Sequence, residues 1–290
     1  SRDKGENPIP MAGFPHHQLE GYLAKLIQAG FRAAVCEQVE DARKAKGLVK
    51  REVTRVVSPG TLTDEALLNP QEHNYLAAIT LGPQPKASSS KTGLKVIDVK
   101  EPRVGVAWAE LSTGTFFAAD FSRDELVDQL ARINPSECLV SEEAHEALLA
   151  YQPRGMMLTP RPEWAFSRDA ATSALSHQFG TKTLDGMGFD EQDGLAIQAA
   201  GAVLEYLQET QKTSLDHIRR LTPYRNSETL EIDEATRRSL ELTRTIRDGQ
   251  REGSLLSTLD RTVTSMGARL LTDWLANPLT DLGLIEARQE

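Results

Sequence analysis

The sequence predicts a mixed α/β, multidomain protein: a small α/β unit, a larger α/β unit and an all-helical segment. Its 290 residues are enough for two or three domains that each bury a core. Strand-like and helix-like apolar patterns alternate along the first two thirds, and from about Ile218 the pattern becomes nearly all-helical. We expect domains at residues 1–60, 74–215 and 216–290, joined first by a linker at 61–73.

The small unit is predicted to contain one helix and two strands. The helix carries a one-sided apolar stripe and is ended by Gly30; the stripe is Leu19, Tyr22, Leu23, Leu26 and Ile27. Strands are expected at residues 31–39 and 52–57, and Pro59-Gly60 ends the second.

The larger unit is predicted to hold three strands in a meander, followed by helix, strand, short helix and strand. The strands are expected at residues 75–81, 103–111, 115–121, 137–141 and 156–159. A Pro-, Ser- and Gly-rich stretch at 82–93 is expected to be a mobile hairpin loop.

Helix boundaries come from local signals. Ser122 to Glu125 has the pattern of a capping box, and the helix after it should stop before Asn134-Pro135. A long helix is expected at 190–211, although Gly194 and Gly201 each cost it about 1 kcal/mol relative to Ala, so tertiary packing must hold it.

The last segment is predicted to be helical after a short extended piece at 229–232. Asp233 is a suitable N-cap for a helix that runs to Ile246, and another helix is expected at 265–275. The apolar stripe of these helices lacks partners within the chain, so we expect poor order or association through that stripe.

Composition excludes some classes of protein. No apolar run approaches the roughly 20 residues of a membrane span, and the first residues are polar where a secretory signal would be apolar, so we expect a cytoplasmic protein with no membrane partner. Cys36 and Cys138 lie in apolar runs and are expected to be buried, reduced thiols.

Charge is distributed unevenly along the chain. The net charge is −9, yet residues 1–64 hold ten basic and eight acidic side chains, against 23 and 34 in the remainder. The one dense basic stretch is 42–55, with six basic residues and one acidic residue. It is either a solvated surface or a phosphate-binding patch.

Several stretches resemble one family, in the same order along the chain. They are IPMAGFPHHQLEGYLAKL and AVCEQVED within 9–41, VVSPGTLTDEALL at 56–68, AELSTGTF, INPSECLV, QFGTKTLDGMGF, EIDEATRRSLEL, and LDRTVTSMGARLLTDWLANP at 259–278. With the two strings within 9–41 counted as one stretch, seven such matches in order are not plausibly coincidental. The chain is similar to the MutS family of DNA mismatch-recognition proteins.

The resemblance implies a domain assignment. Residues 1–60 would be the C-terminal part of the mismatch-binding domain, 74–215 an RNase H-like connector domain, and 216–290 the start of the core and lever domain. The family's Gly-Asp-Phe-Tyr-Glu segment and a phosphate loop of the form G-x-x-x-x-G-K-[ST] do not occur in this sequence. We therefore expect a central fragment that is not an enzyme by itself and holds no cofactor.

The resemblance also implies a function for the full-length protein. It would be a homodimer that binds duplex DNA with mismatches or small loops, uses ATP, ADP and Mg²⁺ to form a sliding clamp, and recruits MutL. The candidate DNA contacts in this chain are Arg2, Met11, Lys44, Lys46, Lys50 and Arg51. His16-His17 has no third ligand at useful spacing, so we expect no zinc site.

Two alternatives remain open at this stage. An RNase H-like nuclease would hold two Mg²⁺ ions, and Asp98, Glu110 and Asp120 are the carboxylates it could use, although they do not obviously converge. A MutS paralogue without mismatch recognition would usually lack the first domain. No serine or cysteine nucleophile motif is present, and Arg237, Arg238 and Arg269 are expected to form structural ion pairs.

Overall fold

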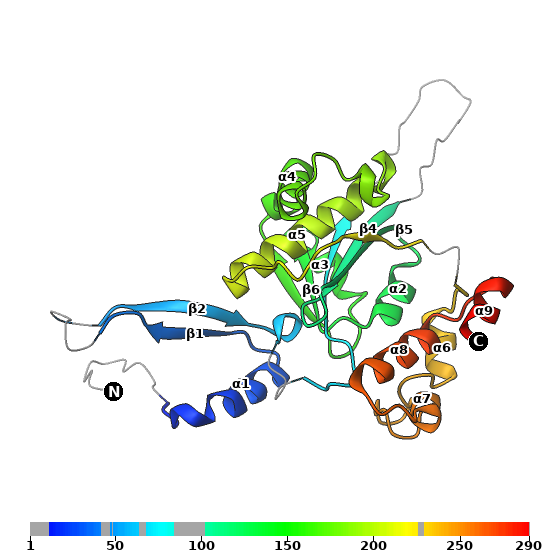
Figure 1. Ribbon diagram of the computed structural model, residues 1–290, viewed down its shortest axis with the longest axis horizontal. Helices are drawn as coiled ribbons and strands as arrows, with labels where there is room; N and C mark the ends of the chain where they lie inside the picture. Colours follow the sequence, from blue (N-terminus) through cyan, green and yellow to red (C-terminus); the bar gives the residue numbers. More distant parts are fainter. Residues whose placement is uncertain are drawn as a thin grey trace.

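The structure is a computed structural model that describes residues 12–41, 47, 49–63, 68–83, 102–225 and 229–289. Figure 1 shows three parts: a first unit (12–57), a central unit (74–225) and a helical unit (229–289). A connecting segment (58–73) lies between the first two.

The first unit is one helix beside a two-stranded ribbon. A 3-10 turn, η1 (His16–Gln18), leads into α1 (Leu19–Gln28), and the antiparallel strands β1 (Ala33–Gln38) and β2 (Arg51–Val57) follow. The predicted helix and strands are confirmed, and Gly30 after α1 has the positive φ of +79° expected of a helix-ending glycine. In Figure 1 the ribbon projects away from the central unit.

The apolar stripe of α1 is only half covered. Leu23 and Ile27 are buried, whereas Tyr22 and Leu26 remain 40% and 43% exposed. Ile27 packs with Val57 and Leu62 in a small cluster. The first unit therefore has a thin core.

The central unit is built on a six-stranded sheet in the order β7-β6-β3-β4-β5-β8. Its strands are β3 (Tyr75–Leu81), β4 (Arg103–Glu110), β5 (Thr115–Ser122), β6 (Glu137–Ser141), β7 (Met157–Arg161) and β8 (Thr222–Pro223). β3, β4 and β5 form the predicted antiparallel meander, while β6 pairs parallel with β3 and β7 parallel with β6. Of the loop expected at 82–93, all but the first two residues lie outside the described part of the chain.

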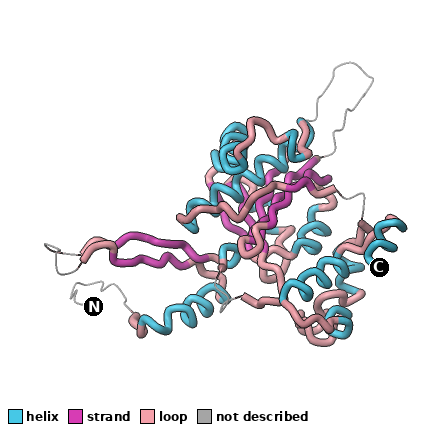
Figure 2. The backbone as a smooth tube through the Cα atoms, viewed as in Figure 1, coloured by secondary structure: helices cyan, strands magenta, loops and turns pink. Residues whose placement is uncertain are grey.

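Helices cover both faces of this sheet (Figure 2). They are α2 (Leu126–Ile133), α3 (His145–Leu149), α4 (Arg168–Phe179) and α5 (Gly194–Gln211), with the 3-10 turns η3 (Glu163–Phe166), η4 (Asp185–Met187) and η5 (Glu191–Asp193). The alternation along β3 sends Leu76 and Ala78 into the cluster under α4 and α5, and Ala77 and Ile79 into the cluster that includes α2. Period-2 alternation thus builds two cores from one strand.

Two glycines let α5 lie close to its neighbours. A Cβ on Gly105 of β4 would stand 2.1 Å from the backbone carbon of Leu195, and a Cβ on Gly201 of α5 would stand 2.2 Å from the Cβ of Ala171 in α4. Such distances leave no room for a side chain. The helix cost of Gly201 is therefore offset by close packing between α4 and α5.

The capping signals of the central unit are partly confirmed. The Glu125 carboxylate accepts the Ser122 backbone N–H at 2.9 Å, which is one half of the expected box, but α2 begins only at Leu126. The helix ends at Asn134, which adopts a left-handed φ of 49°. Asp190 caps η5 before α5 begins, and α4 is a helix that the sequence patterns did not predict.

The helical unit contains α6 (Glu234–Ser239), α7 (Leu255–Leu259), α8 (Ser265–Ala276) and α9 (Leu282–Gln289). Asp233 is the N-cap of α6, accepting the Thr236 N–H at 2.6 Å as expected. The prediction that this helix reaches Ile246 is wrong, because Glu241 takes a φ of 46° and its carbonyl accepts the Leu255 N–H. That turn lays Leu242 against α7 instead.

Large apolar side chains remain exposed on the helical unit, in agreement with the expected unpartnered stripe. Val263 is 98% exposed, Met266 81% and Leu270 49%. Within the described residues, no helix has the length and apolar character needed to cross a bilayer.

Candidate nucleic-acid interface and interdomain joints

The predicted DNA contacts gather on the ribbon as far as they can be placed. Arg2, Met11, Lys44 and Lys46 lie outside the described residues. Lys50 and Arg51 stand at the start of β2, which is the end of the ribbon remote from the central unit (Figure 1), and both are exposed.

Part of this ribbon charge is balanced locally. Lys50 Nζ lies 2.5 Å from a carboxylate oxygen of Glu52, and hydrogen bonding to Glu52 raises the pKa of Lys50. The Lys50 backbone N–H donates to the Glu40 carboxylate at 2.6 Å. Both side chains of the Lys50–Glu52 pair are more than half exposed, so solvent weakens the pair and leaves Lys50 able to contact a phosphate.

The cysteine prediction is half right. Cys138 is a buried thiol whose pKa is raised by desolvation, but Cys36 is exposed. Cys36 is exposed because a two-stranded ribbon has little else packed on it. No group of three or more His, Cys, Asp or Glu side chains suited to a metal ion occurs in the described part of the chain.

The carboxylates considered for a nuclease do not meet. Asp98 lies outside the described residues. Glu110 pairs with Thr115 at one end of the β4–β5 ladder, and Asp120 pairs with Gly105 five residues further along. At about 3.3 Å per residue that is about 16 Å, whereas two-metal sites keep their ions about 3.5 to 4 Å apart.

Asp120 has a structural role at the start of α5. Its Oδ1 accepts the Ala196 backbone N–H at 2.6 Å, next to the first turn of the helix. Burial raises the pKa of Asp120 to about 6, although that backbone N–H and Arg103 act in the opposite direction. The carboxylate therefore satisfies a free helix amide rather than a metal ion.

The joint between the first and central units is centred on a buried carboxylate, Glu137, at the start of β6. Its Oε2 accepts from the Ser58 hydroxyl and from the Gly60 N–H at 3.0 Å. Its Oε1 accepts from Thr159 Oγ1 at 2.7 Å and the Tyr206 hydroxyl at 2.9 Å. Four donors replace the water that this fully buried carboxylate has lost.

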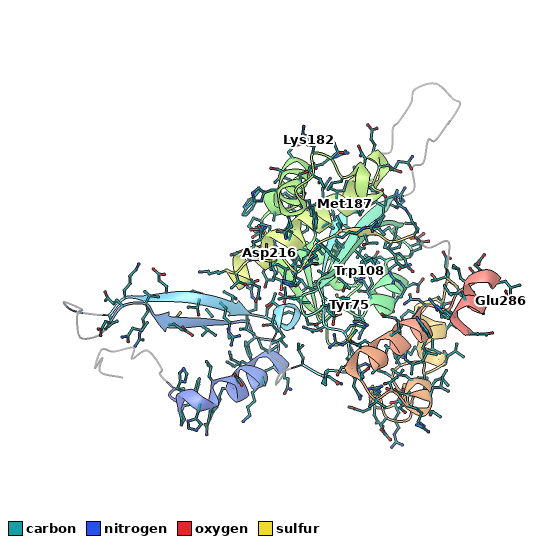
Figure 3. The ribbon with its side chains drawn as sticks, in the orientation of Figure 1. Tyr75, Trp108, Lys182, Met187, Asp216 and Glu286 are labelled. Atoms are coloured by element: carbon teal, nitrogen blue, oxygen red, sulfur yellow. The ribbon has the colours of Figure 1, made fainter. Side chains whose placement is uncertain are left out.

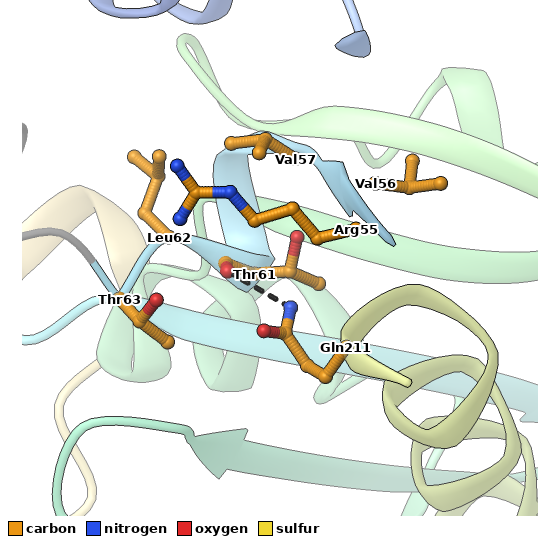
Figure 4. A pocket seen from close by; sticks show the side chains of 7 residues that line it. All are labelled: Arg55, Val56, Val57, Thr61, Leu62, Thr63 and Gln211. Carbon is orange, nitrogen blue, oxygen red and sulfur yellow. Dashed lines mark hydrogen bonds between the residues drawn. The ribbon is translucent and has the colours of Figure 1, made fainter. Parts of the chain in front are cut away.

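Close packing reinforces this first joint. The turn η2 (Pro59–Thr61) is buried at Gly60 and Thr61, and a Cβ on Gly60 would come within 2.8 Å of Glu137 Cβ. The side-chain amide of Gln211, at the end of α5, donates to the Thr61 carbonyl at 3.2 Å (Figure 4). Lys212 Nζ donates to the Val53 carbonyl at 2.9 Å.

A cavity of about 440 Å³ opens beside this joint. Its walls come from both units, including Val35, Glu37 and Arg55 of the ribbon and Leu215 and His217 of the central unit. His217 Nε2 is 2.9 Å from the Leu111 carbonyl, which fixes its ring in the wall.

The joint between the central and helical units is ionic. His73 lies with Nδ1 2.8 Å from Glu110 Oε2 and Nε2 3.2 Å from Asp273 Oδ2, the latter at ion-pair distance without hydrogen-bond geometry. Arg269 Nη1 is 3.2 Å from Glu110 Oε1, and Thr113 Oγ1 donates to Glu110 at 3.0 Å. Burial lowers the pKa of His73, but the neighbouring carboxylates Asp273 and Glu110 outweigh it and raise the pKa to about 9.

The helical unit also makes polar contacts with the connecting segment beside this second joint. Arg244 pairs with Glu72 at 3.1 Å, Arg251 donates to Gln71 at 2.5 Å, and Arg269 Nε donates to the Pro70 carbonyl at 3.0 Å. Of the described residues, none beyond Tyr224 belongs to an apolar core cluster. The prediction that Arg269 forms a structural ion pair is confirmed, whereas Arg237 donates to the Ala276 carbonyl and Arg238 is exposed.

The sequence patterns did not reveal the two joints. Glu137 carried a signal, because it is an acidic residue inside an apolar strand, but its donors are scattered from Ser58 to Tyr206. His73 lies in a polar connection and gave no periodic signal.

Together, the fold and the joints define a multidomain scaffold, in which a mixed sheet carries a two-stranded ribbon on one side and a helical unit on the other. The family described as MutS domain II matches residues 74–219, MutS domain I matches 1–66 and MutS domain III matches 235–290. The chain belongs to the MutS family.

A curated relative agrees with this assignment. The chain is 54% identical over 296 residues to a protein of Rhodopirellula baltica named DNA mismatch repair protein MutS. The match covers all of this chain and 33% of the relative, so the chain spans about one third of that protein's length.

Proposed function

We propose that this chain provides part of the DNA-facing surface, the connector and the beginning of the helical core of a protein that binds mismatched duplex DNA. The observation that carries the proposal is that the three MutS domains match in order along one chain, with the basic stretch 42–55 falling inside the first. The match of domain I to residues 1–66 argues against a paralogue without that domain.

The central unit is proposed to be a non-catalytic, RNase H-like connector. Support comes from its strand order, in which an antiparallel meander of β3, β4 and β5 is extended by parallel β6 and β7 on the β3 side. The separation of Glu110 from Asp120 argues against metal-ion chemistry on this sheet. A fold of this kind carries no activity by itself.

The full-length protein is proposed to be a homodimeric ATPase that forms a clamp on DNA and recruits MutL. The rationale is the family membership. Within this chain, the rigid central unit is the part we expect to present a docking face to MutL. A titration of the chain with the N-terminal region of MutL, followed by NMR, tests this. If the chemical shifts change only at residues outside the central unit, MutL docks elsewhere on the chain.

DNA binding by the ribbon can be tested by charge removal. We expect weak, non-specific binding whose affinity falls as the salt concentration rises. When Lys50 and Arg51 are both changed to Gln, the slope of log affinity against log salt concentration should become shallower by about 2, since each phosphate contact contributes about 0.9. The matched control is Lys182→Gln with Arg154→Gln, two exposed cations of the central unit. An unchanged slope in the ribbon variant would show that the ribbon does not face DNA.

Mismatch discrimination is a separate measurement. We expect the chain to prefer a G·T duplex over its paired counterpart by less than about tenfold, or about 1.4 kcal/mol. The reason is that the family's Gly-Asp-Phe-Tyr-Glu segment does not occur in this sequence. A larger preference would mean that the ribbon and α1 themselves distinguish a mispair.

A further inference from the structure

The two joints of the central unit differ in kind. At the first joint, Glu137 is fully buried and its four donors come from the connecting segment, β7 and α5. At the second joint Glu110 is also buried, but two of its partners, His73 and Arg269, are charged side chains of other segments. The remaining contacts there are polar as well, and they include the Glu234 N–H with Asp128 and Arg132 with Asn277. Polar interfaces of this kind between domains are typical of parts that move relative to each other.

The position of His73 determines its charge. A neutral imidazole donates from one ring nitrogen and presents a lone pair at the other. Both nitrogens of His73 face carboxylates, Glu110 on β4 and Asp273 on α8. Only the doubly protonated ring interacts favourably with both, so His73 is a cation that bridges the central and helical units.

The surroundings favour this cation. Arg269 is the nearby competing positive charge, but it binds the other oxygen of Glu110 and the Pro70 carbonyl. The Tyr75 ring stacks on His73 with centroids 5.0 Å apart, and Arg132 interacts electrostatically with Tyr75 from the α2 side. Two carboxylates thus face the imidazolium at close range.

We propose that the second joint is an ionic latch closed by His73 between Glu110 and Asp273, and that opening it lets the central unit move away from the helical unit while carrying the first unit with it. The first unit follows because the Glu137 joint is buried and closely packed at Gly60. This inference rests on the geometry of the joints, and it stands or falls separately from DNA binding.

The latch can be tested by distance measurements between spin labels in the 290-residue chain. Lys182 in the central unit and Glu286 in the helical unit are exposed and well separated (Figure 3), so Lys182→Cys with Glu286→Cys in a Cys36→Ser background reports on the second joint. Native Cys36 with Lys182→Cys reports on the first joint, because Cys138 is buried and stays unlabelled.

His73→Gln and Asp273→Asn each remove the cationic bridge. We expect either variant to raise the fraction of longer distances across the second joint by at least about threefold, and 1 M salt to shift the unmodified chain the same way. The Cys36–Lys182 distances should not change. His177→Gln, at an exposed histidine of α4, is the matched control and should leave both pairs unchanged.

Two results would overturn the latch. One is an unchanged second-joint distribution in both variants. The other is an equal change at both joints, which would indicate general loosening of the central unit. Asp273→Asn is included because Asp273 is 45% exposed, so that variant tests the latch even where His73→Gln fails to fold.

The charge on His73 has its own readout. An NMR titration of the imidazole should give a pKa of about 9, and Asp273→Asn should lower it. Because the folded-state pKa lies above the ordinary value, the stabilisation is complete below about pH 6.5 and is lost as the pH rises through about 9. A His73 pKa at or below the ordinary value would show that the bridge is not cationic.

Discussion

Replacing Gly201 with alanine tests the close packing of α4 on α5. In an isolated helix this change is favourable by about 1 kcal/mol. In this fold the new Cβ would stand 2.2 Å from Ala171 Cβ and 2.5 Å from Ala171 Cα. Since the Cα belongs to the backbone, the clash is relieved only when the two helices separate.

The expected cost follows from these opposing effects. Overpacking a core costs about 1–3 kcal/mol, and contact with backbone favours the upper end. Subtracting the helix gain of about 1 kcal/mol leaves a net destabilisation of about 2 kcal/mol. Gly201→Ala combined with Ala171→Gly removes the contact with the Ala171 Cβ but leaves the 2.5 Å contact with the Cα of residue 171, so the double variant should recover only part of the lost stability.

Urea unfolding followed by tryptophan fluorescence measures this free energy. A Trp274→Phe background restricts the signal to Trp108 and Trp164, both in the central unit. Gly194→Ala is the control in the same helix, because its Cβ meets only the flexible end of Arg168 at 3.4 Å, and we expect it to be neutral or stabilising by up to about 1 kcal/mol.

The single variant decides the outcome. If Gly201→Ala is as stable as the original chain, the two helices are not in close contact at this point. A destabilised Gly194→Ala would instead show that α5 does not tolerate alanine even where the new Cβ meets only the flexible end of Arg168.

Three further predictions concern buried and exposed titratable groups. Glu137→Gln should destabilise the chain by about 2 kcal/mol in chemical unfolding, because an amide nitrogen then faces a donor, whereas the exposed Glu142→Gln should have no effect. Asp120 has a folded-state pKa of about 6, so the original chain should lose stability relative to Asp120→Asn as the pH rises from about 4 to 6, by about 1 kcal/mol after allowing for solvent screening; equal pH profiles would exclude this. Cys36 should react with a thiol-exchange reagent in the folded chain and Cys138 only after unfolding, which mass spectrometry of the modified peptides can check.

The sequence predicted β1 to β7 in their observed order along the chain because the signals are local, but it missed the two-residue β8, which lies where the helical segment was expected to begin. Alternation at β4 and the turn after Glu110 specify that hairpin without reference to the rest of the chain. α4 escaped prediction because only Ala171 and Leu175 of its twelve residues are buried, too few to mark an apolar face.

The functional interpretation was limited by contacts between distant residues. Glu110 was a candidate metal ligand from its place at a strand end, but its partners His73 and Arg269 lie 37 and 159 positions away. Cys36 was predicted to be buried from its apolar neighbours, and that rule fails on a ribbon with little packed against it.

The Glu137 joint also constrains the order in which the chain can fold. Ser58 and Gly60 precede Glu137 by 79 and 77 positions in the sequence, and Tyr206, whose hydroxyl also donates to Glu137, follows it by 69 positions. Contacts between such distant residues incur the entropy of closing long loops before they contribute stability. Until β6, β7 and α5 have assembled, docking of the ribbon would bury the Glu137 carboxylate without all its hydrogen-bond donors. We therefore expect the N-terminal ribbon to dock last, although it is synthesised first.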